Sequence, residues 1–129
     1  MACAAALASL DLFDRNDLVH AVEQNSERLS ELLRALAGLP HVGDVRQKGF
    51  MVGVELVRNR QTREAFDPKR RIGAAVCARL RKHGVLLRPL GDVVVLMPPL
   101  AMGLEDLEKI VTAIREEVGA LRPDGTFRD

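Results

Sequence analysis

The sequence predicts an α+β fold in which helices pack on one face of a small antiparallel or mixed sheet. Two pairs of short apolar runs, each pair meeting at a turn that contains glycine, indicate four strands arranged as hairpins. Three longer segments repeat their apolar residues at spacings of three and four, which is typical of helices with one buried side. Strands that come in hairpins, rather than singly between helices, favour an α+β arrangement over a parallel sheet.

The chain opens on an Ala- and Leu-rich segment, residues 2–12, with no recognisable N-cap before it. We interpret this segment as a helix that is already under way at Met1. A helix this short is marginal by itself, and one so apolar has to pack against another surface. We therefore expect residues 1–15 to continue from a part of the protein upstream of Met1.

Residues 16–39 form the first segment with clear helical periodicity. Asp14 or Asn16 is the expected N-cap, and Gly38 with Pro40 is expected to end the helix. The apolar positions that predict one buried side are Leu18, Val19, Val22, Leu29, Leu32, Leu33 and Leu36.

Two predicted strands follow at residues 42–48 and 50–57, and Gly49 between them indicates a hairpin turn. Gly53, within the second strand, predicts either a bulge or the close approach of another backbone. The segment 58–67 is polar and is expected to form a loop.

A third helix is predicted over residues 68–83. Asp67 followed by Pro68 is a typical N-cap with proline at the first helical position, and Gly84 is the expected C-terminal glycine. The side expected to be buried carries Ile72, Val76 and Leu80, with Ala75 and Ala78 nearby.

The second hairpin is predicted from the runs 85–87 and 93–97, with R-P-L-G-D, residues 88–92, as the tight turn between them. A last helix is expected from Gly103 or Leu104 to about Leu121. Its apolar stripe consists of Leu104, Leu107, Ile110, Val111, Ile114 and Val118.

Residues 16–121 are therefore expected to form one domain, followed by a mobile polar tail at residues 122–129. The 129 residues carry a net charge of +1 with acidic and basic residues interspersed, which argues against nucleic-acid and membrane partners. No apolar run approaches the roughly 18 residues that a transmembrane helix needs.

The two cysteines, Cys3 and Cys77, both fall in predicted helices and suggest neither a disulfide framework nor a metal site. We therefore expect a cytoplasmic protein with reduced thiols. Many ligand pockets are lined by aromatic rings, but the sequence has no Trp and no Tyr. A ligand pocket in this domain would therefore need another polypeptide segment for part of its wall.

Few residues suggest chemistry. His20, His41 and His83 lie far apart in the sequence, and His83 is better explained as a partial charge at a helix C-terminus than as a catalytic group. Cys77 has no adjacent base in the sequence and is expected to fill the core.

Glu55, which stands between Val54 and Leu56, is expected to face outward from a half-solvated strand. Lys48 and Lys69 lack the apolar setting that activates a Schiff-base lysine. No glycine-rich loop precedes a helix N-terminus to hold a phosphate. By its residues alone, the chain shows no catalytic constellation and no metal site.

Arg88 is the candidate binding residue. Its neighbours are apolar, so its guanidinium has to reach solvent or an anion, and its planar fork fits a carboxylate through two charge-assisted hydrogen bonds. Pro89 restricts the backbone and favours a preset arginine at the end of a buried strand. The residues alone leave open whether Arg88 binds a ligand or pairs with Asp92.

Three stretches resemble the class III pyridoxal-phosphate aminotransferases. Residues 71–100, with R-P-L-G-D followed by L-M-P-P, resemble the C-terminal region of that family. The opening A-C-A-A-A-L-A-S-L resembles the helix after its N-P-L motif, and V-R-Q-K-G-F-M-V-G-V-E-L at residues 45–56 resembles its V-R-G-x-G-x-M-x-G-I-E hairpin. The resemblance extends to about Gly119.

The resemblance implies the small C-terminal domain of a fold-type I homodimer that moves amino groups through pyridoxal phosphate. It places the cofactor lysine and the other cofactor-binding residues in a large domain upstream of Met1. We therefore expect no catalytic residue, no bound cofactor and no activity in this chain alone. Within the family, the similarity is greatest to members that act in biotin biosynthesis. These members imply S-adenosylmethionine as amino donor and 8-amino-7-oxononanoate as acceptor, with Arg88 contacting the acceptor's carboxylate.

Two positions depart from the family pattern. Many relatives carry an aromatic residue where Leu90 stands, and often Tyr where Val95 stands, so the resemblance does not determine the shape of the pocket wall here, while Arg88 is unaffected. An omega-amino acid or acetylornithine aminotransferase domain is an alternative within the class. A free-standing α+β module that binds a small carboxylate through Arg88 is an alternative from another class.

Overall fold

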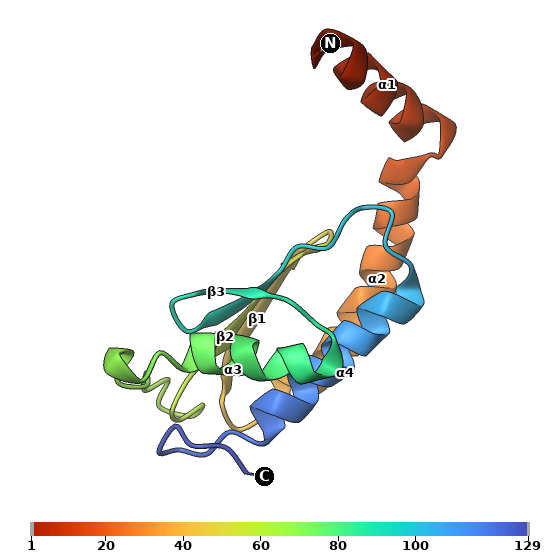
Figure 1. Ribbon diagram of the computed structural model, residues 1–129. Coiled ribbons are helices and arrows are strands. Elements are labelled where there is room, and N and C mark those ends of the chain that lie inside the picture. The colour runs from red at the N-terminus through yellow and green to blue at the C-terminus, as the bar shows by residue number, and fades with distance from the viewer. Residues whose placement is uncertain (1, 129) are drawn as a thin grey trace.

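The computed structural model describes residues 2–128. It contains four helices around a four-stranded sheet, which confirms the predicted α+β class (Figure 1). The helices are α1 (Ala2–Arg15), α2 (Leu18–Ala37), α3 (Ile72–Leu80) and α4 (Leu104–Gly119). The strands are β1 (Val42–Lys48), β2 (Met51–Leu56), β3 (Arg88–Leu90) and β4 (Val93–Leu96), and two 3₁₀ turns lie at Pro68–Arg70 and Arg81–His83.

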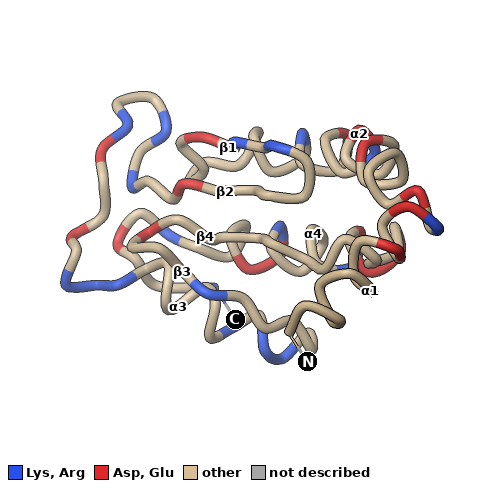
Figure 2. The backbone as a smooth tube through the Cα atoms, turned by 90° about the horizontal axis from the view of Figure 1, so that it is seen from above, with Lys and Arg blue, Asp and Glu red and all other residues tan. Residues whose placement is uncertain are grey.

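The sheet has the strand order β1-β2-β4-β3, and every neighbouring pair is antiparallel. Figure 2 shows the four strands side by side in this order, with helices on one side of them. Helix α2 packs on β1, α3 packs on β3 and β4, and α4 contacts both of these helices. The predicted arrangement, with helices on one face, is therefore confirmed, and the other face is open.

Alternation along the strands separates the two faces. In β2, Val52, Val54 and Leu56 are buried toward the helices, while the residues between them are half-buried or exposed. Val94 and Leu96 of β4 continue the same buried row. The core is completed by α2, α3 and α4, with Leu29, Leu33, Leu36, Ile72, Val76, Leu80, Leu107, Val111, Ile114 and Val118.

The N-terminal helices differ from the prediction. Helix α1 extends to Arg15, projects away from the domain and buries none of its residues (Figure 1). Neither Asp14 nor Asn16 caps α2, because Asp17 holds that position in the left-handed region at φ 44° and its side chain makes no capping bond. Val19, predicted to be buried, is 73% exposed, since the domain body begins only further along α2.

The first hairpin is confirmed, with Gly49 in its turn at φ +57°. The interpretation of Gly53 is wrong on both alternatives. The irregular register lies between Val42 and Asp44 instead, and the closest neighbour of an added Cβ at Gly53 is the Val93 side chain at 3.3 Å, not a backbone.

The second hairpin is shifted from its prediction. The run 85–87 is not a strand; β3 comprises Arg88–Leu90, so the turn to β4 is formed by Gly91 and Asp92 alone. Pro89 explains why β3 lies at the edge, since proline has no N–H to donate to a further strand. Gly91 takes a positive φ of +60°, as such a tight turn requires.

The predicted third helix is divided into a 3₁₀ turn, α3 and a second 3₁₀ turn. Arg71 interrupts it in the left-handed region at φ 49°. The predicted ends are confirmed: the Asp67 carboxylate accepts a hydrogen bond from the Lys69 N–H at 3.0 Å, and Gly84 ends the segment at φ +73°.

The polar tail folds back on the domain within residues 2–128. Leu121 and Phe127 form a β-bridge, and the Arg128 N–H donates to the Ala120 carbonyl at 2.8 Å. The Arg79 guanidinium lies 4.6 Å from the centre of the Phe127 ring. The mobility of the tail stays a prediction. Within the described part of the chain, no helix has both the length and the apolar character to cross a bilayer.

Candidate functional site

The open face of the sheet carries an apolar surface on β3 and β4. Leu90, Val93 and Val95 line it together with Met51 and Met97, around a shallow hollow of about 360 Å³. Leu90 is 74% exposed and Met97 is 64% exposed, although strand positions with apolar side chains are normally covered. This surface is therefore the candidate for binding a ligand or a further protein surface.

Arg88 lies on the same open face. In the register of the sheet, Arg88 pairs with Val95, Val95 with Gly53, and Gly53 with Arg46, so these four residues form one row across the strands. Arg88 is exposed on an edge strand, and the prediction that it ends a buried strand is wrong. The row places one arginine on each side of the apolar hollow.

Asp92 is not the partner of Arg88. Its carboxylate accepts a hydrogen bond from the Gly73 N–H at the start of α3, at 2.9 Å. A Cβ on Gly73 would lie 2.2 Å from the Gly91 carbonyl oxygen, so only glycine permits this approach of helix and turn. The R-P-L-G-D segment thus fixes the β3–β4 turn on α3 and leaves the Arg88 side chain outside that contact.

Arg46 is a site residue that sequence reasoning missed. It lies 3.6 Å from the Asp44 carboxylate and 3.7 Å from the Glu55 carboxylate on the open face, where Arg46 is exposed and the other two side chains are half-buried. Glu55 therefore faces outward as predicted. The signal for Arg46 was the strand register, because the pairing of residue 46 with residue 53 follows once Gly49 is placed in the turn.

The other candidate residues do not gather at this face. The His20 ring hydrogen-bonds Gln24 on the exposed side of α2, and His41 is buried with Nδ1 3.1 Å from the carbonyl oxygens of Val57 and Arg58. Cys77 is buried as predicted, and burial raises the pKa of its thiol, which makes it an inert core residue.

His83 lies in the last turn of the 3₁₀ segment Arg81–His83, as expected of a basic residue at a helix end, and its ring also contacts acidic side chains. Its Nε2 lies 2.7 Å from the Glu117 carboxylate, which also contacts Lys82 at 2.7 Å and the Arg79 guanidinium. Burial alone raises the pKa of Glu117, but hydrogen bonds from Lys82, His83 and Arg79 outweigh it and hold this pKa at about 2. Sequence reasoning missed Glu117, which is 2% exposed.

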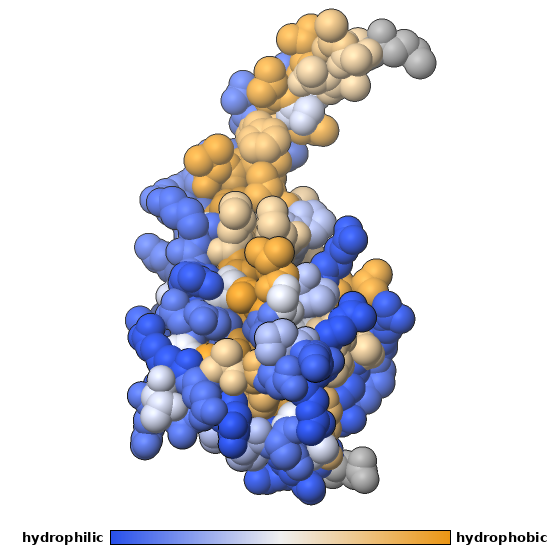
Figure 3. All heavy atoms as spheres, turned by 90° about the vertical axis from the view of Figure 1, so that its left-hand side faces the viewer, coloured by the Kyte–Doolittle hydropathy of each residue, from blue (hydrophilic) through white to orange (hydrophobic). Residues whose placement is uncertain are grey.

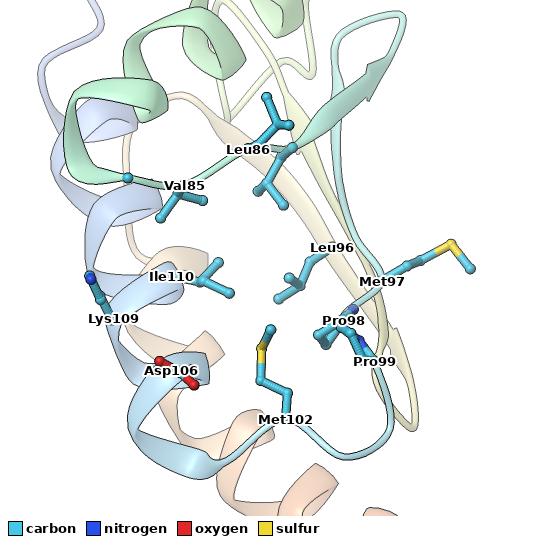
Figure 4. A pocket seen from close by; sticks show the side chains of 12 residues that line it. Val85, Leu86, Leu96, Met97, Pro98, Pro99, Met102, Asp106, Lys109 and Ile110 are labelled. Atoms are coloured by element: carbon cyan, nitrogen blue, oxygen red, sulfur yellow. The ribbon is translucent and has the colours of Figure 1, made fainter.

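A second, apolar cavity of about 400 Å³ lies between β4, the segment before β3 and the first turns of α4. Figure 4 shows Val85, Leu96, Met102 and Ile110 turned toward its centre, with Asp106 and Lys109 at the side. Most of its lining is apolar, and its charged members, Asp106 and Lys109, lie at the side, so we do not assign it as a catalytic centre.

Comparisons with known proteins identify the family of this domain. The sequence model of the aminotransferase class-III family matches residues 1–118. The chain belongs to the class-III aminotransferases. It is 47% identical over 125 residues to the adenosylmethionine-8-amino-7-oxononanoate aminotransferase of Nitratidesulfovibrio vulgaris, a match that covers 97% of this chain and 23% of that relative.

Two solved aminotransferase structures resemble the chain. The crystal structure of adenosylmethionine-8-amino-7-oxononanoate aminotransferase from Methanocaldococcus jannaschii is 35% identical with a TM-score of 0.87, over 90% of this chain and 26% of that one. A pyridoxal-phosphate-bound amine transaminase from an uncultivated Pseudomonas species is 36% identical with a TM-score of 0.82, over 88% and 26%. The chain therefore spans about a quarter of the length of these relatives.

The described residues do not by themselves fit pyridoxal phosphate. A Schiff-base lysine needs a desolvated setting, whereas Lys48, Lys69, Lys82 and Lys109 are all exposed. Lys82 is also paired with Glu117. Within residues 2–128, no glycine-rich loop leads into a helix N-terminus that would hold the phosphate.

Proposed function

We propose that this chain is the substrate-side domain of an aminotransferase that moves the amino group of S-adenosylmethionine to 8-amino-7-oxononanoate, in biotin biosynthesis. The observation that carries the proposal is the row on the open face, in which Arg88 stands beside an apolar hollow. The names of the relatives supply the reaction.

The chemistry of the acceptor suits this surface. A nonanoate has a carboxylate at one end of an aliphatic chain, so it needs a cation next to apolar surface. The Arg88 guanidinium offers two parallel donors to the carboxylate, and Leu90, Val93 and Val95 offer the apolar contact. The residues of this chain would thus bind and orient the acceptor and exclude water from its methylene groups.

Pyridoxal phosphate, bound by the rest of the enzyme, would supply the amino-transfer chemistry. We propose that α1 packs against that large domain. Leu7, Leu10 and Leu12 of α1 are each more than half exposed, and Figure 3 shows apolar residues gathered over this helix. The full-length enzyme would be a homodimer in the cytoplasm, and the 129-residue chain would be inactive without its large domain.

The test is Arg88→Ala in the full-length enzyme. Removal of a charged hydrogen-bond partner costs about 2 kcal/mol, so KM for 8-amino-7-oxononanoate is expected to rise roughly 30-fold. The absorbance of the bound cofactor should not change. Arg115→Ala, an exposed arginine on α4, is the matched control and should leave KM unchanged. An unaltered KM in Arg88→Ala would remove the proposed carboxylate contact.

A second candidate is an omega-amino acid or amine transaminase. It is favoured by Leu90 and Val95, which leave the hollow without an aromatic wall, and by the similarity to the Pseudomonas amine transaminase. Turnover of the full-length enzyme with S-adenosylmethionine, and with simple amines as donors, separates the two. Faster turnover with simple amines would favour this second candidate.

A further inference from the structure

A third hollow lies at the end of the domain that carries the C-terminus, away from α1 (Figure 1). Its volume is about 730 Å³, and it lies where the start of β1, the loop after β2 and the folded-back tail meet. Three arginines, Arg58, Arg60 and Arg128, line it together with His41. These four residues are not part of the proposed acceptor site, and they do not belong to the hydrophobic core.

His41 presents one nitrogen to this hollow. The residue is 5% exposed, and its Nδ1 is 3.1 Å from two carbonyl oxygens, those of Val57 and Arg58. Because carbonyl oxygens only accept, Nδ1 carries the proton and Nε2 carries the lone pair. Within residues 2–128, Nε2 makes no hydrogen bond. Every fully buried side-chain nitrogen in that part of the chain does have a hydrogen-bond partner, so Nε2 is not fully buried. Nε2 therefore opens to the hollow as an acceptor.

The charges around the hollow are not balanced within the described chain. The Glu64 carboxylate engages Arg58 at 2.9 Å. For Arg60 and Arg128, residues 2–128 provide no carboxylate within ion-pair distance, and both side chains are exposed. The hollow thus combines two cationic guanidinium groups with one acceptor, Nε2, on the otherwise buried ring of His41.

We infer that this hollow binds inorganic hydrogen phosphate, which keeps an O–H at neutral pH, whereas a phosphate monoester is largely a dianion without one. Two guanidinium groups bind the anionic oxygens of such a group, and the remaining O–H donates to Nε2 of His41. Sulfate and carboxylates have comparable charged oxygens but no O–H at neutral pH. The lone pair of His41 therefore selects the protonated oxyanion.

The hollow is separate from the row that contains Arg88. Arg46 lies five residue positions after His41, along the start of β1, which is roughly 16 Å at about 3.3 Å per residue. Arg88 lies three strands further across the sheet, roughly another 14 Å. Occupation of the hollow therefore requires no displacement of a ligand at Arg88.

Calorimetric titration of the 129-residue chain at neutral pH tests the inference, with inorganic phosphate and sulfate as probes. Phosphate should bind at least about tenfold more tightly than sulfate. Arg60→Gln and Arg128→Gln should each weaken phosphate binding about tenfold, whereas Arg115→Gln, which does not line the hollow, should leave it unchanged. Equal binding of sulfate and phosphate would overturn the inference, as would unchanged binding in Arg60→Gln and Arg128→Gln.

A second measurement addresses His41 without replacing it, because a substitution there would break its two bonds to the backbone. The ¹⁵N signal of Nε2 should move when phosphate is added and stay in place with sulfate. An Nε2 signal that stays in place when inorganic phosphate is added would overturn the inference.

Discussion

Charged residues are arranged oppositely on the two sides of the sheet. In the helix layer, the buried Glu117 carboxylate contacts Arg79, Lys82 and His83 from the end of α3. On the open face, Arg88 is exposed on an edge strand, and no ion pair within residues 2–128 involves it. The helix layer satisfies its polar groups internally, while the open face offers a cation and apolar surface to something else.

This difference between the helix layer and the open face suggests that the two sides of the sheet have different roles, one in stability and one in ligand binding. A buried carboxylate is tolerated only with close partners. The packing of α3 against α4 therefore depends on the contacts that Glu117 makes with its basic neighbours. No such constraint applies to Arg88, whose charge is solvated in this chain. Substitutions in the helix layer are therefore expected to change the free energy of unfolding, and substitutions on the open face to change ligand binding.

The largest expected effect is that of Glu117→Ala. Removal of the buried Glu117 carboxylate breaks its charge-assisted contacts with Arg79, Lys82 and His83, so the free energy of unfolding should fall by about 3 kcal/mol. Urea denaturation measures it. Glu116→Ala is the matched control, since its side chain is 55% exposed and only 3.7 Å from His83, and its effect should be within about 0.5 kcal/mol. Equal losses in both variants would contradict the assigned role of the cluster.

A smaller effect is expected from acid. The pKa of Glu117 is about 2 in the folded chain, below the ordinary value of 4.5, so its stabilisation is complete above pH 4.5 and is lost as the pH falls toward 2. At pH 3 the loss should be about 1 to 2 kcal/mol relative to neutral pH. Glu117→Gln should lack this component. A parallel pH dependence of unfolding in both chains would show that other carboxylates dominate acid unfolding.

Much of the fold could be predicted because it follows from local patterns. Alternation in β2 and a turn glycine at residue 49 determine the first hairpin, and helical spacing determines α4. The position of β3 could not be derived from hydrophobicity, because the run 85–87 is as apolar as a strand. Pairing with β4 selects Arg88–Leu90 instead, since Gly91 and Asp92 form the turn.

The candidate site could be predicted in part. Guanidinium chemistry and the family resemblance singled out Arg88, but its exposure on an open face depends on which elements cover the sheet. Arg46 and Glu117 were missed because each acquires its partners from a distant part of the chain or from strand pairing. From the sequence alone, a charged residue in an amphipathic helix is expected to face solvent. Its burial becomes evident only once the neighbouring helix is in position.

The smallest expected effect is that of Leu90→Thr on the open face. Leu90 is 74% exposed, and threonine keeps the preference for strand, so the free energy of unfolding of this chain should change by less than about 0.5 kcal/mol. Leu96→Ala, on the helix side of the neighbouring strand and 1% exposed, should cost about 3 kcal/mol in the same urea experiment. If Leu90→Thr cost as much as Leu96→Ala, the open face would already be packed within this chain. The contrast between the two sides, and the reason to place substrate binding at Arg88, would then be lost.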